Sequence, residues 1–193
     1  MQTAKNVRQS LLDAGMSLLQ EQGVTALTQP RVAAAAGVKQ SHLTYYFPKR
    51  GDLLLGIAEH TIDTVMTDLA GRLERRADPR TMREGITATM IKGLPPRVMM
   101  GLFVAADADP ALRPALRRLI RGIRIRIRGL LERSGLPATE EAVALFHAAV
   151  IGLSVLHHAR RSQESARELK SGVGLLLGLL AQLPAGDTKG EAA

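Results

Sequence analysis

Four consecutive polar side chains are the clearest chemical signal in the chain. Residues 39–42 supply a cation, an amide, a hydroxyl and an imidazole, in that order, at the start of a short predicted helix. An amide can hydrogen-bond the edge of an adenine in the major groove, and a lysine can reach a guanine or a phosphate. A turn with a purely structural role has no need of four such groups in succession, so the pattern predicts a helix that reads DNA.

Aromatic and basic residues follow this segment. A tyrosine at 45 or 46 can pack its ring against the protein and direct its hydroxyl to a phosphate, and simple packing is an equal alternative for Tyr45. Lys49 and Arg50 stand at the start of a long predicted helix, whose positive N-terminal end also favours a phosphate. The predicted DNA-binding residues are Thr28, Gln29, Lys39, Gln40, Ser41, His42, Tyr45, Tyr46, Lys49 and Arg50.

The residues around this segment predict a helix-turn-helix over about 28–47. Thr28 is typical of a helix N-cap, and Pro30 suits a first turn because its missing N–H is not needed there. Gly37 allows the tight turn between the two short helices. Pro48 biases Phe47 away from helical geometry and should end the second helix.

Apolar residues recur at helical spacing along the whole chain, and no strand pair is predicted. The expected helices cover about 4–22, 29–36, 39–45, 50–76, 80–93, 95–106, 110–134, 138–161 and 163–183. We therefore predict an all-α protein. A three-helix DNA-binding domain at 1–50 is joined by a long helix to a second helical domain at 51–184, and the small polar residues 185–193 form a disordered tail.

Composition narrows the class of protein. The chain has 193 residues, 46% of them hydrophobic, so a sizeable core can be buried. It has no cysteine, which excludes disulfides, thiolate zinc sites and cysteine nucleophiles. The longest apolar run, 173–181, is far shorter than the roughly 20 residues of a membrane span. No secretory signal is evident, and we expect a soluble, cytoplasmic protein with no membrane partner.

The net charge of +8 suggests a polyanionic partner but does not locate its site. Residues 1–60 hold six basic and four acidic side chains, a net charge of +2, and the rest of the chain carries +6. The DNA-binding prediction therefore depends on the motif and not on the charge.

The order of residues over about 5–60 resembles the N-terminal domain of the TetR family of transcriptional regulators. The matching residues include Leu11-Leu12-Asp13-Ala14, Leu18-Leu19, Gly23, Thr28, Val32-Ala33, Ala36-Gly37-Val38, Leu43, Tyr45-Tyr46-Phe47, Arg50 and Leu53-Leu54. The resemblance implies a homodimer that grips a palindromic double-stranded DNA operator, with a C-terminal domain that binds a small inducer. Four positions depart from the family pattern: Thr44 replaces a tyrosine, Arg50 a lysine, Gly15 an alanine and Leu27 a frequent threonine.

The residues leave three functions to compare. The first is a repressor that a small molecule releases from its operator. The second is a DNA-binding regulator without such a ligand, controlled by abundance or a protein partner. The third is an all-α enzyme, and it is disfavoured because the sequence offers no paired carboxylates, catalytic triad or metal-ligand cluster. No enzyme activity, cofactor or metal is therefore expected.

The C-terminal part carries weaker signals. Met99, Met100, Phe103 and His147 are candidates for a ligand pocket, with a plain core as the alternative. We expect dimerisation through a four-helix bundle made from the last two helices, with ordinary packing inside one chain as the alternative. Its candidate residues are Phe146, Val150, Leu153, Val173, Leu176, Leu177 and Leu180, beside the glycines 172, 174 and 178.

The strongest charge cluster lies between Arg113 and Arg133. Eight arginines occur in this span, and Glu132 is its only acid. A solvated helix face is the simpler interpretation, and a pocket for an anionic ligand such as a carboxylate is the alternative. The sequence leaves the role of this cluster open.

Overall fold

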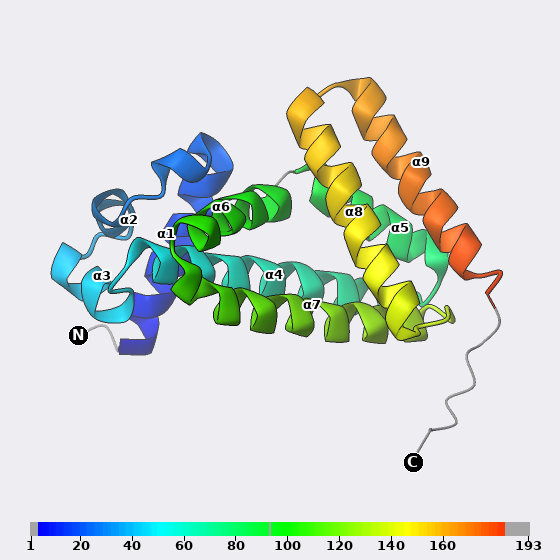
Figure 1. Ribbon diagram of the computed structural model, residues 1–193, viewed down its shortest axis with the longest axis horizontal. Helices are drawn as coiled ribbons and strands as arrows, with labels where there is room; N and C mark the ends of the chain where they lie inside the picture. The colour runs from blue at the N-terminus through cyan, green and yellow to red at the C-terminus, as the bar shows by residue number, and fades with distance from the viewer. Residues whose placement is uncertain (1–3, 93, 184–193) are drawn as a thin grey trace, which may run out of the picture. The chain divides into compact units, whose positions relative to one another are not determined.

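The computed structural model describes residues 4–92 and 94–183, and within them the chain is helical, with no strand (Figure 1). The predicted all-α class is confirmed. The predicted tail at 185–193 lies outside the described residues. The elements, in chain order, are α1 (Ala4–Gln22), η1 (Val24–Ala26), α2 (Gln29–Ala35), α3 (Gln40–Tyr46), α4 (Arg50–Arg75), α5 (Pro79–Ile91), α6 (Leu94–Ala108), η2 (Pro110–Leu112), α7 (Arg113–Arg133), α8 (Glu140–Arg160) and α9 (Gln163–Leu180).

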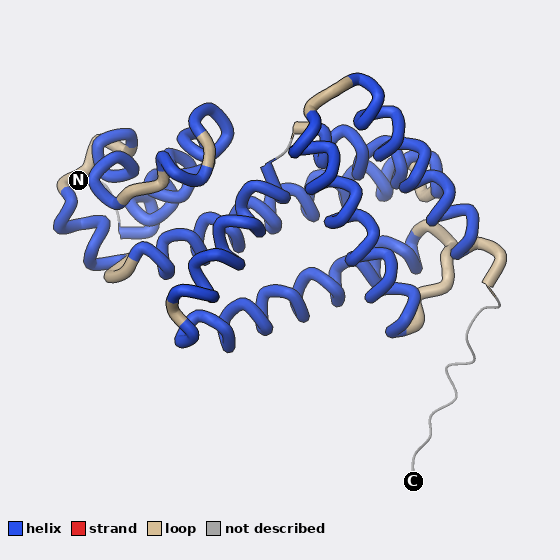
Figure 2. The backbone as a smooth tube through the Cα atoms, turned by 45° about the horizontal axis from the view of Figure 1, so that its top comes forward, coloured by secondary structure: helices blue, strands red, loops and turns tan. Residues whose placement is uncertain are grey.

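Short loops join these helices, as Figure 2 shows, and the observed bounds lie close to the predicted ones. Two differences are short 3₁₀ turns. The turn η1 follows Gly23 and spans only three residues, too few to show a period. The turn η2 replaces the start of the predicted helix 110–134, because the Asp109 side chain accepts a hydrogen bond from the Ala111 N–H, 3.1 Å away.

The chain forms two compact units. Unit 1 runs to Val65 and includes Lys92–Ile120; unit 2 is Met66–Ile91 together with the residues from Arg121 on. The predicted boundary at residue 50 follows the end of the helix-turn-helix and not these units. The first half of α4 belongs to the core of unit 1, because Leu53, Leu54 and Ile57 are buried there. The functional division at residue 50 stays a prediction.

The core of unit 1 brings apolar side chains from α1 to α4 and from α6 together. Leu11, Val32, Leu43, Ile57 and Leu102 are each fully enclosed. Burying a side chain of this size contributes about 1.5–3 kcal/mol. The short helices α2 and α3 make few bonds of their own, so this shared core fixes how they lie against α1.

Unit 2 packs α5, α8 and α9 against one another. Residue Arg161, with φ +47°, ends α8 in the left-handed conformation. Ser162 and Ser165 then form a reciprocal capping box that starts α9. The buried His157 Nδ1 lies 2.8 Å from Ser165 Oγ, which joins the end of α8 to the start of α9.

Candidate nucleic-acid interface

The polar start of α3 is exposed. Lys39, the N-cap residue, and the next three side chains face solvent, and Leu43 is fully buried beneath them. The turn that sets this orientation places Gly37 at φ +67°. It is closed by a 3.0 Å hydrogen bond from the Val38 N–H to the Ala33 carbonyl. The predicted cation, amide, hydroxyl and imidazole thus lie together on the solvent side of the DNA-binding domain at 1–50, which we call the head.

Thr44 takes no part in this exposed set. Its hydroxyl donates to the carbonyls of Gln40 and Ser41, at 3.2 and 3.1 Å. This is the usual local bond of a threonine inside a helix. The hydroxyl is therefore occupied within α3, and no aromatic ring stands where the family pattern has a tyrosine.

The two tyrosines at the end of α3 differ in their surroundings. Tyr45 is 80% exposed, whereas Tyr46 packs against the core of unit 1. Their rings meet edge to face, with centroids 5.1 Å apart. The next ring, Phe47, is buried, and the guanidinium of Arg8 lies 5.6 Å from its centroid. Tyr45 is therefore the more accessible of the two tyrosines, and its phosphate contact stays a prediction.

Thr28 and Gln29 stand at the start of α2, and the side chain of Gln29 bonds to the backbone of another part of the motif. Thr28 is the N-cap, as predicted, but its side chain makes no capping hydrogen bond. The Gln29 side-chain amide donates to the carbonyls of Phe47 at 2.7 Å and Pro48 at 3.3 Å. The side chain of Gln29, a predicted DNA contact, thus joins α2 to the loop after α3. Periodicity could not reveal a bond between residues so far apart in sequence.

The start of α4 presents two basic side chains with different partners. Arg50 Nε donates to the Leu27 carbonyl at 3.2 Å. Lys49 Nζ lies 3.7 Å from the Asp109 carboxylate, and its side chain is 68% exposed. The backbone N–H of Lys49 donates to the Asp52 carboxylate at 2.9 Å, which caps the helix.

A further basic residue was not among the predicted contacts. Arg31 is exposed in the first turn of α2, and its guanidinium donates to the Gln22 side chain. Its basic side chain next to Pro30, at the start of the first helix of the motif, is the signal that could have identified Arg31 as a candidate phosphate contact.

The candidate ligand residues fall in both units. Met99 is buried, Met100 is half-buried and Phe103 is 43% exposed, all three on α6 in unit 1. His147 is half-buried on α8 in unit 2. A common pocket for these four residues stays a prediction.

The candidate dimerisation residues need a correction. Leu153 is half-buried, and the other six are buried inside the protomer, where α8 and α9 pack together; they are Phe146, Val150, Val173, Leu176, Leu177 and Leu180. The most apolar stripe of each helix is the one that its own chain covers, so spacing alone selected the intrachain contact. Two of the glycines also lie at contacts inside the protomer. A Cβ on Gly172 would lie 2.9 Å from Leu153 of α8, and one on Gly174 would lie 3.2 Å from Arg83 of α5.

A second stripe on each helix is exposed, and we call the two together the outer face of unit 2. It consists of Leu145, Ala148, Gly152 and Leu156 on α8 and of Leu175, Gly178 and Leu179 on α9. The glycines of the outer face, Gly152 and Gly178, have no atom within 4 Å of where a Cβ would stand. By length and composition, α8 could also cross a membrane, with 33% of its apolar window buried in the protomer. Within the described residues, no three of His, Asp and Glu gather as a metal site would require.

Comparisons with known proteins agree with the geometry of the head. Residues 11–57 match the family of bacterial regulatory proteins called tetR, and residues 97–181 match a tetracyclin repressor-like C-terminal domain. Over 75 residues the chain is 39% identical to the HTH-type transcriptional repressor LfrR of Mycolicibacterium smegmatis. That match covers 39% of this chain and 36% of the repressor, about a third of the relative's length.

Two longer matches extend over nearly the whole chain. The HTH-type transcriptional regulator CymR of Pseudomonas putida is 24% identical over 177 residues, which covers 87% of each protein. The crystal structure of a transcriptional regulator from Saccharomonospora viridis in complex with choline shares the fold, with a TM-score of 0.68 and 14% identity. It covers 90% of this chain and 96% of that one. With an exposed recognition helix, an all-helical C-terminal part and matches to both halves of the family, the chain belongs to the TetR family of DNA-binding transcriptional regulators.

Proposed function

We propose that the protein is a repressor that binds a palindromic operator as a homodimer and leaves it when a small molecule binds the C-terminal helices. The observation that carries this proposal is the start of α3, where four polar side chains are exposed over the buried Leu43. A recognition helix reads DNA from its N-terminal residues, and these residues occupy that position.

The contacts divide by chemistry into base readout and phosphate binding. Gln40 is the candidate for an adenine edge, and Lys39 for a guanine or a phosphate. The exposed hydroxyl of Tyr45 and the ammonium of Lys49 are candidates for phosphates on either side. Gln29 and Arg50 also support the motif, because the Gln29 amide and the Arg50 Nε donate to the backbone carbonyls of Phe47 and Leu27.

The outer face of unit 2 supports the dimer. Leu145, Leu156, Leu175 and Leu179 are each more than half exposed, on two helices that pack side by side. Large apolar side chains left exposed on neighbouring helices are a candidate association site. Gly152 and Gly178 allow a second pair of helices to approach closely, so the four-helix bundle remains the proposed arrangement, with different side chains from those first predicted.

Response to a small molecule is supported by the relatives. The regulator from Saccharomonospora viridis was crystallised with choline, and the Mycolicibacterium smegmatis relative is a repressor. A ligand that prefers one arrangement of the dimer would move the two heads away from the spacing of one DNA turn, about 34–36 Å. Such a protein acts in the cytoplasm.

Selection of binding sites from random DNA tests the proposal. We expect the full-length protein to enrich a palindrome whose half-sites lie one helical turn, or a whole number of turns, apart. Recovery of no preferred sequence, or of a single half-site without symmetry, would overturn it. Titration of the recovered operator with small molecules then separates a ligand-responsive repressor from a regulator controlled by abundance or a protein partner.

A further inference from the structure

In unit 2, two arginines of α7 lie across from one glutamate and one histidine of α8. The Arg128 guanidinium donates to the Glu140 carboxylate. Arg124 lies one helical turn before Arg128 on the same face of α7. His147 lies two turns beyond Glu140 on the same face of α8. We call these two pairs the α7–α8 ladder. Its first pair is Arg128 with the carboxylate of Glu140, and its second pair is Arg124 with the imidazole of His147.

The second position of this ladder lacks an acid. Within the described part of the chain Arg124 has no ion pair, whereas Arg128 has Glu140. Burial, and then the charge of Arg124, lower the pKa of His147 below its ordinary value of 6.5, so the imidazole is neutral at pH 7.

Two polar atoms of this cluster are buried and unsatisfied. His147 Nε2 and Arg128 Nε are both inaccessible to solvent, and neither has a hydrogen-bond partner among the described residues. Buried polar atoms are nearly always paired, because burying them unpaired costs free energy. A solvated helix face does not account for this pair, since both atoms are shielded from water.

The surrounding charge selects the sign of a ligand. From Arg121 to Arg133, α7 carries five arginines and the single acid Glu132. Across from them, the first turn of α8 holds Glu140, which already contacts Arg128, and Glu141. An anion would meet uncompensated positive charge beside Arg124, and a cation would meet repulsion there.

We propose that Arg124, Arg128 and His147 bind the carboxylate of an anionic effector. The planar guanidinium of Arg124 matches a carboxylate in a bidentate manner, and the neutral His147 donates from Nε2 in the tautomer that carries the proton there. The proposal rests on the function proposed above and names the chemical class of its ligand. It differs from what the relatives suggest, because choline, the ligand of the Saccharomonospora viridis regulator, is a cation.

Three ring compounds of nearly equal shape test the sign of the ligand: benzoate, benzamide and benzamidine, which are anionic, neutral and cationic. Binding to the full-length protein is followed by NMR of the histidine side chains, of which the chain has five, with His147 assigned from His147→Gln. We expect benzoate to shift the His147 resonances saturably and to raise the pKa of that imidazole. Benzamide and benzamidine should leave both unchanged.

Arginine variants locate the site. Arg124→Gln should weaken benzoate binding at least tenfold. The matched control is Arg133→Gln, which removes the same charge from an exposed position at the end of α7 and should leave the affinity unchanged. The inference is overturned if neither benzoate nor octanoate shifts His147. It is equally overturned if the two arginine variants weaken binding alike, which would indicate general attraction to a basic helix.

The outcome for the operator separates this inference from the proposed function. Release of operator DNA by choline or benzamidine, but not by a carboxylate, would retain the ligand-responsive repressor and remove the anion site. Failure to bind any operator would remove the proposed function. The His147 measurement is made without DNA, so it still decides whether the anion site exists.

Discussion

The side-chain amide of Gln29 donates a 2.7 Å hydrogen bond to the carbonyl oxygen of Phe47, 18 residues away. This bond joins the first turn of α2 to Phe47, the C-cap residue that follows the last residue of α3. Two short helices held in this way can present a rigid surface to DNA, because their relative orientation no longer depends on the turn at Gly37 alone.

Gln29→Ala should therefore act on stability. Loss of a partly buried hydrogen bond of this kind costs about 0.5–1.5 kcal/mol, so the melting temperature should fall. Operator affinity should fall with it, but the slope of log affinity against log salt should stay the same, since no phosphate contact is removed. Thermal melts and fluorescence anisotropy at several salt concentrations measure both effects. A flatter salt slope at unchanged stability would assign Gln29 to the DNA contacts instead.

Gln40→Ala tests the base readout. The side chain is exposed in the first turn of α3, so its removal should leave the melting temperature unchanged. If the amide reads an adenine edge, the variant should lose about 1–3 kcal/mol on the preferred operator and little on random duplex DNA. Competition anisotropy with both duplexes provides the comparison. An equal loss on both would mean that Gln40 contacts the backbone.

Gly15→Ala should destabilise the head, although alanine is the better helix former. A Cβ at this position of α1 would lie 2.4 Å from Ile57 Cδ1, and Ile57 is fully enclosed. Overpacking a core costs about 1–3 kcal/mol, more than the gain of up to about 1 kcal/mol in helix propensity. The matched control is Gly71→Ala on α4, where the nearest atom, on the Arg75 side chain, is 4.0 Å away. Chemical denaturation should show a loss for the first variant and a small gain for the second.

Leu175→Glu should break the dimer if the outer face of unit 2 forms it. Leu175 is 66% exposed on α9, so the protomer should still fold, but a carboxylate would be buried unpaired between two copies. Ile125→Glu is the control, since Ile125 on α7 is 67% exposed and lies outside that face. Sedimentation at micromolar concentration should give twice the 20.8 kDa chain mass for the wild type and the control, and the single mass for Leu175→Glu. A dimeric Leu175→Glu would exclude this face.

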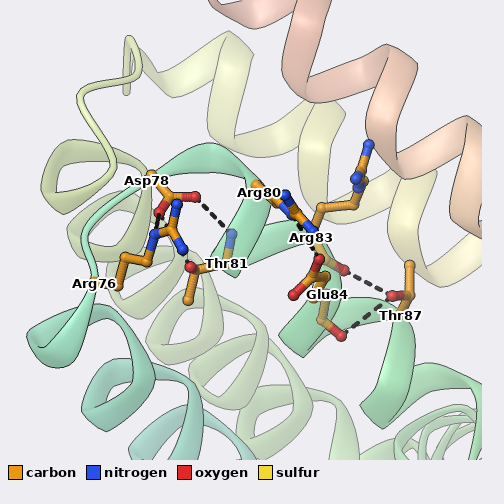
Figure 3. A network of polar contacts seen from close by, with 7 residues as sticks. All are labelled: Arg76, Asp78, Arg80, Thr81, Arg83, Glu84 and Thr87. Carbon is orange, nitrogen blue, oxygen red and sulfur yellow. Dashed lines mark hydrogen bonds and ion pairs between the residues drawn. The ribbon is translucent and has the colours of Figure 1, made fainter.

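We predict that the stability of the folded protein depends on pH through Asp78. Its carboxylate accepts a 2.8 Å hydrogen bond from the Thr81 N–H at the start of α5 and pairs with Arg76 (Figure 3). These contacts, with the Thr81 N–H first, hold the pKa of Asp78 below its ordinary value of 3.8. The stabilisation is complete above that ordinary value and is lost as the pH falls through the lowered value of the folded state. Asp78→Asn keeps a capping side chain without the charge, so the two melting temperatures should converge in acid. A difference that stays constant with pH would contradict this role.

The helices and the exposed polar start of α3 were predictable from the sequence alone, and the DNA contacts of these residues stay a prediction. Local signals carry these features, because a glycine turn, a proline break and a helical period each act within a few residues. The order from Gly37 to His42 was therefore enough to predict an exposed polar segment, and the structure shows it above the buried Leu43.

The folded structure was needed to show which polar and apolar side chains already contact other parts of the chain. Gln29 and Arg50 were predicted as DNA contacts from their side-chain chemistry, and those contacts stay predictions. The structure adds that the Gln29 amide and the Arg50 Nε each donate to a distant backbone carbonyl. Phe146 and Val173 have the spacing of an interface, yet their own protomer buries them, and the exposed Leu145 and Leu175 remain for a partner. A helical period records that a face is apolar, but what covers that face depends on residues far away in the sequence, which come together only when the chain folds.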